Sequence, residues 1–282
     1  MFNRFLSTLS VVSRIPIRSR FKFDSSRMDF YLPIAGICPA LTGVLLFAIG
    51  LFFCGVSGKN AGNPALTAII ILVAQYLGFN LFHLDGLMDT ADAFLGSADR
   101  EKRVSILKDS RIGVYGFFAG SADLCLKAVL LYSLLPVARD FPVLVFAYPL
   151  WGRFSAALIP CMSKPLNSEG LGALLKGSRF RYCFGGALIA LLLWTFLVWG
   201  LLLLAAFVGW CLFGIRLDVP QFAGGASIKA LVTAALCMFV ICPLTAYYYA
   251  RLYKKSLGGY TGDALGAAIE ITEVLCLAAS RI

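Results

Sequence analysis

Charged residues are scarce in this chain. Only 14% of its 282 residues are Asp, Glu, Lys or Arg, whereas 60% are hydrophobic, and the mean hydropathy is +0.83. A soluble domain of this size could not shield so much apolar side chain from water, and apolar runs long enough to cross a bilayer recur along the chain. The composition therefore excludes an ordinary water-soluble protein and predicts an all-α, polytopic membrane helical bundle.

Histidine is nearly absent, and the cysteines form no metal motif. His83 is the only histidine, and none of the nine cysteines belongs to a C-x-x-C pair. A zinc site built on histidines is thereby excluded, and the cysteines are best interpreted as small apolar residues in helices. The N-terminal segment has no small-residue cleavage site after an unbroken apolar stretch, so it is a poor signal peptide.

Seven apolar runs predict about seven transmembrane helices in one integral domain covering residues 1–282. They lie near residues 31–56, 65–83, 113–135, 141–160, 183–214, 228–250 and 262–280. The fifth run is too long for one ordinary crossing, which leaves two tight spans as an alternative. We also expect a short N-terminal helix in the membrane interface, ending near Pro16, because apolar residues share one of its faces: Phe2, Phe5, Leu6 and Leu9.

The basic residues favour a single crossing by the fifth run. With that count, 18 of the 25 Lys and Arg residues fall on one side, in segments 1–30, 84–112, 161–182 and 251–261. The opposite loops hold only Lys59, Arg139, Arg216 and Lys229. The positive-inside rule then places the N-terminus and the basic segments in the cytoplasm. This bias and anionic lipid headgroups account for the net charge of +10 without a nucleic-acid partner.

Three aspartates follow directly after the second apolar run. Asp85, Asp89 and Asp92 stand at spacings of four and three, which places them on one face of a helix. Like charges at the edge of a bilayer repel one another unless a cation lies between them. A hard divalent ion that also binds phosphate fits this pattern better than a merely solvated acidic face does.

A second acidic group occupies the last apolar run. Asp263 follows a glycine-rich turn at Gly258, Gly259 and Gly262, and Glu270 lies two helical turns further on the same face, before Glu273. Asp263 alone is consistent with a simple N-cap, but carboxylates deeper in a spanning helix are costly and suggest function. Both groups enter from the cytoplasmic side, so we expect six carboxylates to converge on one site for a divalent metal ion: Asp85, Asp89, Asp92, Asp263, Glu270 and Glu273.

Basic residues near these acids are candidates for phosphate binding. Lys108 and Arg111 precede the third run and are equally consistent with positive-inside flanking. Arg153 lies inside the fourth run, where it either snorkels or reaches towards the site. Asp123 and Lys127, four apart inside the third run, suggest a neutralised structural pair. His83 is expected to face away from the carboxylates and to be structural or interfacial.

The chain resembles the cobalamin synthase, or adenosylcobinamide-GDP ribazoletransferase, family. The resemblance is carried by HLDGLMDTADAFLG at 83–96, REKRVSILKDSRIGVYG at 100–116 and GGYTGDALGAAIEITE at 258–273, with supporting stretches at 5–16 and 30–36. It implies an enzyme of the cytoplasmic membrane that uses magnesium. The implied donor is adenosylcobinamide-GDP, the acceptor is alpha-ribazole or its 5'-phosphate, and GMP leaves.

These motifs give each candidate residue a predicted role. Asp85, Asp89 and Asp263 are expected to ligate Mg²⁺ on the donor pyrophosphate, and Asp92 is the candidate base or a further ligand. Glu270 and Glu273 would complete the coordination or support it. Lys108 and Arg111 are assigned to catalysis and phosphate binding, and the other substrate-binding candidates are Arg14, Arg153 and Gly262.

Other classes of protein stay open as alternatives. A CDP-alcohol phosphotransferase uses aspartates with similar physical logic, but the chain lacks that family's Ala-Arg pair after Asp-Gly. An intramembrane aspartyl protease needs Gly-x-Gly-Asp, and the chain has Tyr260 at the first position. A cation transporter would carry its acidic residues at mid-membrane, whereas the acidic residues of this chain begin at the cytoplasmic edge. The sequence does not fix the oligomeric state, and a homo-oligomer is compatible with it.

Overall fold

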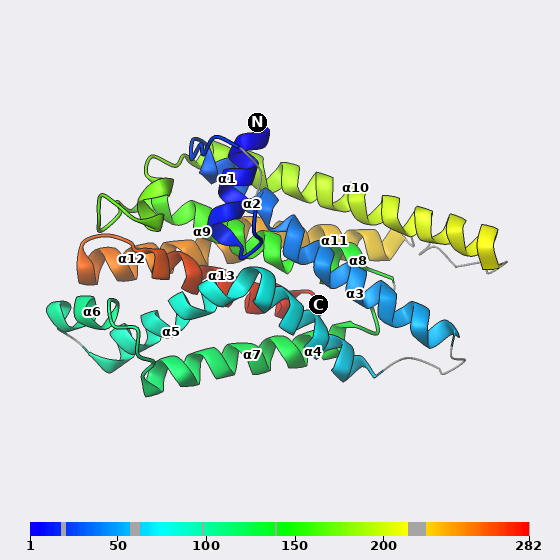
Figure 1. The fold of residues 1–282 in the computed structure, drawn as a ribbon, viewed down its shortest axis with the longest axis horizontal. Coiled ribbons are helices and arrows are strands. Elements are labelled where there is room, and N and C mark those ends of the chain that lie inside the picture. The colour runs from blue at the N-terminus through cyan, green and yellow to red at the C-terminus, as the bar shows by residue number, and fades with distance from the viewer. Residues whose placement is uncertain (18–20, 57–62, 98, 139, 214–223, 282) are drawn as a thin grey trace.

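The computed structural model describes residues 1–17, 21–56, 63–97, 99–138, 140–213 and 224–281, and every regular element within them is a helix. The long helices lie side by side, and α1 crosses them (Figure 1). The elements are α1 (Phe2–Val12), α2 (Met28–Ala35), α3 (Ile37–Val56), α4 (Pro64–Gln75), η1 (Tyr76–Asn80), α5 (Leu81–Gly96), α6 (Arg100–Ile106), α7 (Val114–Leu134), α8 (Pro142–Val145), α9 (Tyr148–Met162), η2 (Leu171–Leu175), α10 (Phe180–Phe213), α11 (Gly224–Leu236), η3 (Cys237–Ile241), α12 (Cys242–Leu257) and α13 (Gly262–Ala279).

Six helical stretches among the described residues are long and apolar enough to cross a membrane. They are Met28–Leu51, Pro64–Gly96, Val114–Leu134, Pro142–Met162, Phe180–Leu204 and Ile228–Leu257. The all-α, multi-pass prediction is therefore confirmed. The seventh predicted span folds as α13, which contains three acidic residues and is not among these six stretches. The count of seven crossings stays a prediction.

The fifth apolar run forms one continuous helix. α10 has 34 residues, which corresponds to about 50 Å at the α-helical rise. Two tight antiparallel spans would require a break in this run, so the structure favours the single crossing. Lys59, Arg139 and Arg216, which the charge argument placed in the opposite loops, lie outside the described residues.

α9 and α13 form the centre of the bundle. Every residue from Tyr148 to Pro160 in α9 is buried, and α13 packs against α5, α7, α9 and α12. Small residues make this packing close: a Cβ on Gly152 of α9 would lie 3.0 Å from the carbonyl oxygen of Ile269 on α13. Both central helices are therefore largely enclosed by other helices, which keeps the deeper carboxylates of α13, Glu270 and Glu273, away from lipid.

The basic segments meet at one end of the bundle, at the left in Figure 1. The Arg100 side chain donates to the Leu257 carbonyl oxygen at 3.0 Å. The loop after α9 pairs with the turn before α13, where the Leu166 amide donates to the Tyr260 carbonyl oxygen at 2.8 Å. The Arg179 amide donates to Asp29 at the start of α2, at 3.0 Å. These contacts place parts of all four basic segments at the same end.

Replacing Gly186 with alanine should destabilise the bundle. Its added Cβ would overlap the backbone carbonyl of Phe30 on α2 and lie 2.9 Å from the carbonyl carbon, and overpacking of this kind costs about 1–3 kcal/mol. Gly200→Ala on the same helix is the matched control, because its Cβ would meet nothing within 4 Å. Thermal unfolding in detergent should show a lower midpoint for Gly186→Ala alone. Equal midpoints would contradict the α2–α10 packing.

Candidate active site

The two acidic helices touch through glycines beside the carboxylates. A Cβ on Gly86 of α5 would lie 3.0 Å from both the Cα and the carbonyl oxygen of Asp263, and a Cβ on Gly266 of α13 would lie 2.9 Å from the carbonyl oxygen of His83. Only glycine permits this backbone approach. The start of α13 therefore packs on α5 at Gly86, which lies between Asp85 and Asp89 in the sequence.

Asp85, Asp89 and Asp263 form one electrostatic group. The charges of Asp85, Asp263 and Asp92 all act on Asp89, and the charge of Asp85 acts on Asp263. Asp85 is exposed, whereas Asp89 and Asp263 are partly buried. Thr261 precedes α13 and donates a hydrogen bond to Asp263 at 3.0 Å, which fixes the direction of that carboxylate. Residues almost 180 positions apart in the chain therefore share one acidic centre.

The chemistry of this centre fits magnesium held jointly by protein and substrate. No group of three or more His, Cys, Asp or Glu side chains in the described ranges is close enough to hold a metal ion alone. Magnesium is ordinarily held by one or two carboxylates together with waters and substrate phosphates. Carboxylates that repel one another at the end of a helix bundle provide such ligands, and a bound cation would relieve their repulsion.

Asp92 binds the N-terminus of α7. Its two carboxylate oxygens accept hydrogen bonds from the backbone amides of Gly113, at 2.7 Å, and Gly116, at 2.8 Å. The side chain is buried. It satisfies amides that have no partner within their own helix, and its charge complements the positive end of the helix dipole. This geometry gives Asp92 a structural task beside the acidic centre.

Glu270 and Glu273 lie deeper in the bundle and are paired with basic residues. Lys127 of α7 makes ion pairs with Glu270 and, at 2.9 Å, with Glu273. Arg153 of α9 pairs with the other oxygen of Glu273. All four side chains are at most 1% exposed. The structure therefore does not bring these two glutamates to the predicted metal, because two buried cations hold them about two helical turns inside it.

The predicted Asp123–Lys127 pair belongs to the same buried network. The Lys127 ammonium lies 3.3 Å from Asp123, and both side chains are buried, so the predicted ion pair is confirmed. The network as a whole holds three carboxylates and two cations, Lys127 and Arg153. One Asp123 oxygen, Oδ1, has no hydrogen-bond partner among the described atoms. The network thus has one negative charge in excess when all five groups are ionised.

Tyr76 and Asn80 complete this network and were not identified from the sequence. The Tyr76 hydroxyl lies 2.5 Å from Glu270 and 2.8 Å from Asp123, and the Asn80 amide donates to Glu273 at 3.0 Å. Both residues belong to the π-helical turn η1. The signal that the sequence offered was a pair of polar side chains, four residues apart, within an apolar run. The Arg153 guanidinium also donates to Asn80, at 2.6 Å, and lies 3.5 Å from the His83 ring.

Of the remaining predicted site residues, Lys108, Arg111 and Gly262 lie at the same end as the acids, whereas the backbone of Arg14 is hydrogen-bonded to η1. Lys108 is exposed. Arg111 is exposed and donates to Asp109 at 2.6 Å, and its hydrogen bonds lower the pKa of the Asp109 carboxyl to about 2. The Arg14 amide donates to the Gly78 carbonyl oxygen in η1 at 2.8 Å, while its side chain is exposed. Gly262 opens α13, and a Cβ added to it would meet nothing within 4 Å.

Comparison with known proteins identifies the family. The model of a family described as cobalamin-5-phosphate synthase matches residues 4–280, almost the whole chain. The chain belongs to this family. The resemblance inferred from residues 83–96, 100–116 and 258–273 is thereby confirmed.

Curated relatives within the cobalamin-5-phosphate synthase family cover the chain from end to end. They include adenosylcobinamide-GDP ribazoletransferases from Clostridium botulinum strain Loch Maree, 28% identical over 98% of this chain and 96% of the relative, and from Fusobacterium nucleatum, 29% identical over 96% and 94%. The Thermosipho melanesiensis protein of the same name is 28% identical over 98% and 97%. No solved structure matches the chain.

Replacing Asp92 with asparagine should separate the two roles open to this residue. Asparagine accepts through one oxygen only, so one α7 amide loses its charged partner, at a cost of about 1.5–3 kcal/mol. We expect a lower thermal midpoint for Asp92→Asn and a moderate fall in turnover. A general base would give the opposite pattern, with an unchanged midpoint and turnover reduced by orders of magnitude.

Proposed function

We propose that this protein transfers the phospho-adenosylcobinamide group of adenosylcobinamide-GDP to alpha-ribazole or its 5'-phosphate, and that GMP is released. Family membership and the names of the curated relatives support the reaction. The observation that supports the site is the meeting of Asp85 and Asp89 with Asp263 at the Gly86–Gly266 contact. The active site then lies at the end of the bundle that carries the basic segments.

The geometry supports distinct roles for the three aspartates. Asp85 and Asp263, one on each helix, would hold Mg²⁺, which neutralises charge on the pyrophosphate and orients it. Asp89 lies within the field of the other carboxylates and is partly buried. The carboxylate of Asp92 is occupied by two amides of α7, so Asp89 replaces Asp92 as our candidate base for the ribose hydroxyl of the acceptor.

The proposed transfer forms one bond to phosphorus, breaks another, and moves one proton to a protein carboxylate. The acceptor oxygen forms a new bond to the phosphorus that carries the cobinamide, and its proton passes to the Asp89 carboxylate. The bond from that phosphorus to the GMP oxygen breaks. Lys108 and Arg111, exposed at the same end, would bind phosphate oxygens as GMP leaves. The positive-inside bias supports a cytoplasmic location for this end, where nucleotide substrates are soluble.

Reconstitution tests the proposed reaction directly. Purified protein in detergent or nanodiscs is incubated with adenosylcobinamide-GDP, alpha-ribazole 5'-phosphate and Mg²⁺, and GMP and the complete corrinoid are followed by chromatography. We expect both products in equal amounts, and neither when Mg²⁺ is removed with a chelator. CDP-diacylglycerol and an alcohol form the control pair. Turnover of that pair alone by a folded sample would instead support a CDP-alcohol phosphotransferase.

A further inference from the structure

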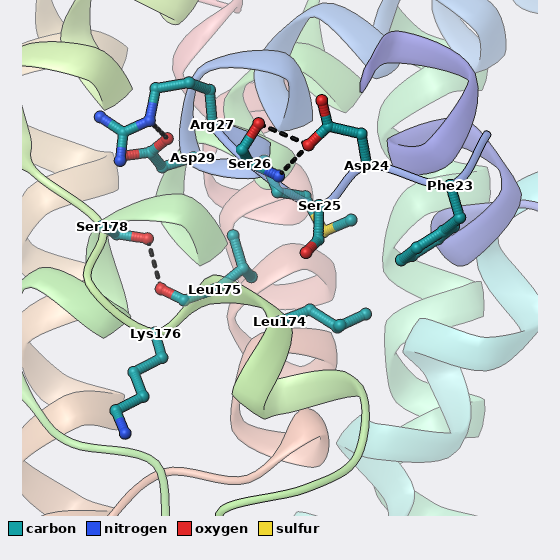
Figure 2. Close-up of a pocket in the computed structure, with 11 residues that line it drawn as sticks. Phe23, Asp24, Ser25, Ser26, Arg27, Asp29, Leu174, Leu175, Lys176 and Ser178 are labelled. Atoms are coloured by element: carbon teal, nitrogen blue, oxygen red, sulfur yellow. Dashed lines mark hydrogen bonds and ion pairs between the residues drawn. The ribbon is translucent and has the colours of Figure 1, made fainter. Parts of the chain in front are cut away.

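A hollow of about 390 Å³ lies beside η2, between the segment that joins α1 to α2 and the loop that leads into α10. Figure 2 shows its two walls, with Phe23 to Asp29 on one side and Leu174 to Ser178 on the other. Its volume falls within the usual range for small-molecule sites. None of the sequence motifs assigned a role to this region.

The hollow adjoins the acidic centre through η2. Leu175 lines the hollow, and Gly172, three residues earlier, packs on the start of α13, where its Cβ would lie 3.2 Å from the Gly262 amide nitrogen. The Tyr260 hydroxyl donates to the Gly172 carbonyl oxygen at 2.9 Å. Three residues of 3₁₀ helix advance about 6 Å. The short helix η2 therefore contacts the start of α13 at Gly172 and lines the hollow at Leu175.

The lining combines groups that bind a base, a sugar and a phosphate. Phe23 is 50% exposed at the rim, although it lies in a loop rather than in a spanning helix, and an exposed ring is a stacking surface for a base. Three hydroxyls, from Ser25, Ser26 and Ser178, line the same space. The Lys176 ammonium is exposed and makes no ion pair within the described part of the chain. It is available to a phosphate.

Arg27 is held in a fixed position over this space. Its φ of 64° is the left-handed backbone conformation, which is uncommon for a residue other than glycine. Its guanidinium carbon lies 4.0 Å from the centre of the Tyr182 ring, and its Nε lies 3.7 Å from Asp29. The second acid of the lining, Asp24, is paired with Arg4 at 2.9 Å. Both acids are thus engaged, and Lys176 is the cation that remains for a ligand.

We propose that the hollow binds a nucleoside 5'-monophosphate unit, with the base on the Phe23 ring and phosphate oxygens near Lys176. This rests on the proposed function, whose substrates contain two such units: the guanosine monophosphate of the donor and the alpha-ribazole 5'-phosphate acceptor. The short distance across η2 would then deliver the reacting phosphate or hydroxyl to the carboxylates of α5 and α13.

Two exposed substitutions test the proposal without disturbing the core. Phe23→Ala and Lys176→Met are compared with Phe180→Ala and Lys255→Met, which remove an aromatic ring and an ammonium group of similar exposure outside the hollow. Calorimetry on purified protein measures the binding of GMP and of alpha-ribazole 5'-phosphate separately. Loss of a stacking ring or a phosphate contact should raise the Kd of the nucleotide about tenfold. It should also raise KM for the substrate that contains this nucleotide. The control variants should bind as wild type.

The outcomes show whether the nucleotide belongs to the donor or to the acceptor. They also separate a failure of the nucleotide site from a failure of the proposed reaction. Weaker binding of GMP alone assigns the hollow to the donor, and weaker binding of alpha-ribazole 5'-phosphate alone assigns it to the acceptor. Wild-type protein that binds neither nucleotide, or variants that bind both as tightly as wild type, would overturn the nucleotide site. If nucleotide binding depends on Phe23 and Lys176 but no complete corrinoid forms, the site stands and the proposed reaction fails.

Discussion

Replacing Asp263 with asparagine should lower transferase turnover by about a thousandfold or more while the bundle stays folded. The substitution keeps the size of the side chain and its hydrogen bond from Thr261, but it removes a charge from the group that we propose faces the pyrophosphate. Stabilisation of transferring phosphoryl groups by metal and charge is usually the largest catalytic contribution. Because Asp263 repels the carboxylate of Asp89, the variant should also be at least as stable as wild type.

Two measurements and one control make this prediction specific. Glu169→Gln, an exposed acid in the loop after α9, should leave turnover within about twofold of wild type, since single surface charges act weakly across solvent. The thermal midpoint should rise on adding Mg²⁺ to wild type and to Glu169→Gln, but less for Asp263→Asn. Full turnover by Asp263→Asn at ordinary Mg²⁺ would remove Asp263 from the metal site.

The sequence predicted the fold and the meeting of the acidic helices for a physical reason. The membrane limits a chain of this composition to helices, because backbone groups in hydrocarbon must be satisfied internally. The distribution of Lys and Arg then indicated which segments share a side. With the sides known, Asp85 and Asp263 had to enter at the same end, and the glycines beside them, Gly86 and Gly266, allowed the contact that the structure shows.

The partners of the deeper carboxylates could not be predicted in the same way. Glu270 follows Asp263 by two turns on one helix face, so spacing alone favours a shared ligand. Its burial against Lys127 depends on how α7 packs on α13, and no local pattern encodes that packing. The contacts of Asp92 could not be predicted for a similar reason. Its position on the face of Asp85 is correct, but the rotation of its side chain is set by two amides of α7.

Replacing Lys127 with methionine should be the most destabilising single change in the bundle interior. Lys127 is fully buried and lies within ion-pair distance of three carboxylates. Its loss would leave Arg153 as the one cation that the described residues place in this network with Asp123, Glu270 and Glu273. Breaking a buried ion pair by removing one partner costs about 3–5 kcal/mol. We expect a strongly reduced yield of folded protein and a lower thermal midpoint in detergent.

Asp123→Asn is the matched test, because it should have the opposite sign. The network has one more carboxylate than it has cations, and Asp123 contributes an oxygen without a partner. Asparagine keeps an acceptor for the Tyr76 hydroxyl, at 2.8 Å from Asp123 in the wild type, and cancels the excess charge. Its thermal midpoint should match or exceed that of wild type, and Lys127→Met combined with Glu270→Gln should recover part of the loss. If Asp123→Asn proved as destabilising as Lys127→Met, excess buried negative charge would not explain the stability of the network. Side-chain packing between α7 and α13 would then be the explanation that remains.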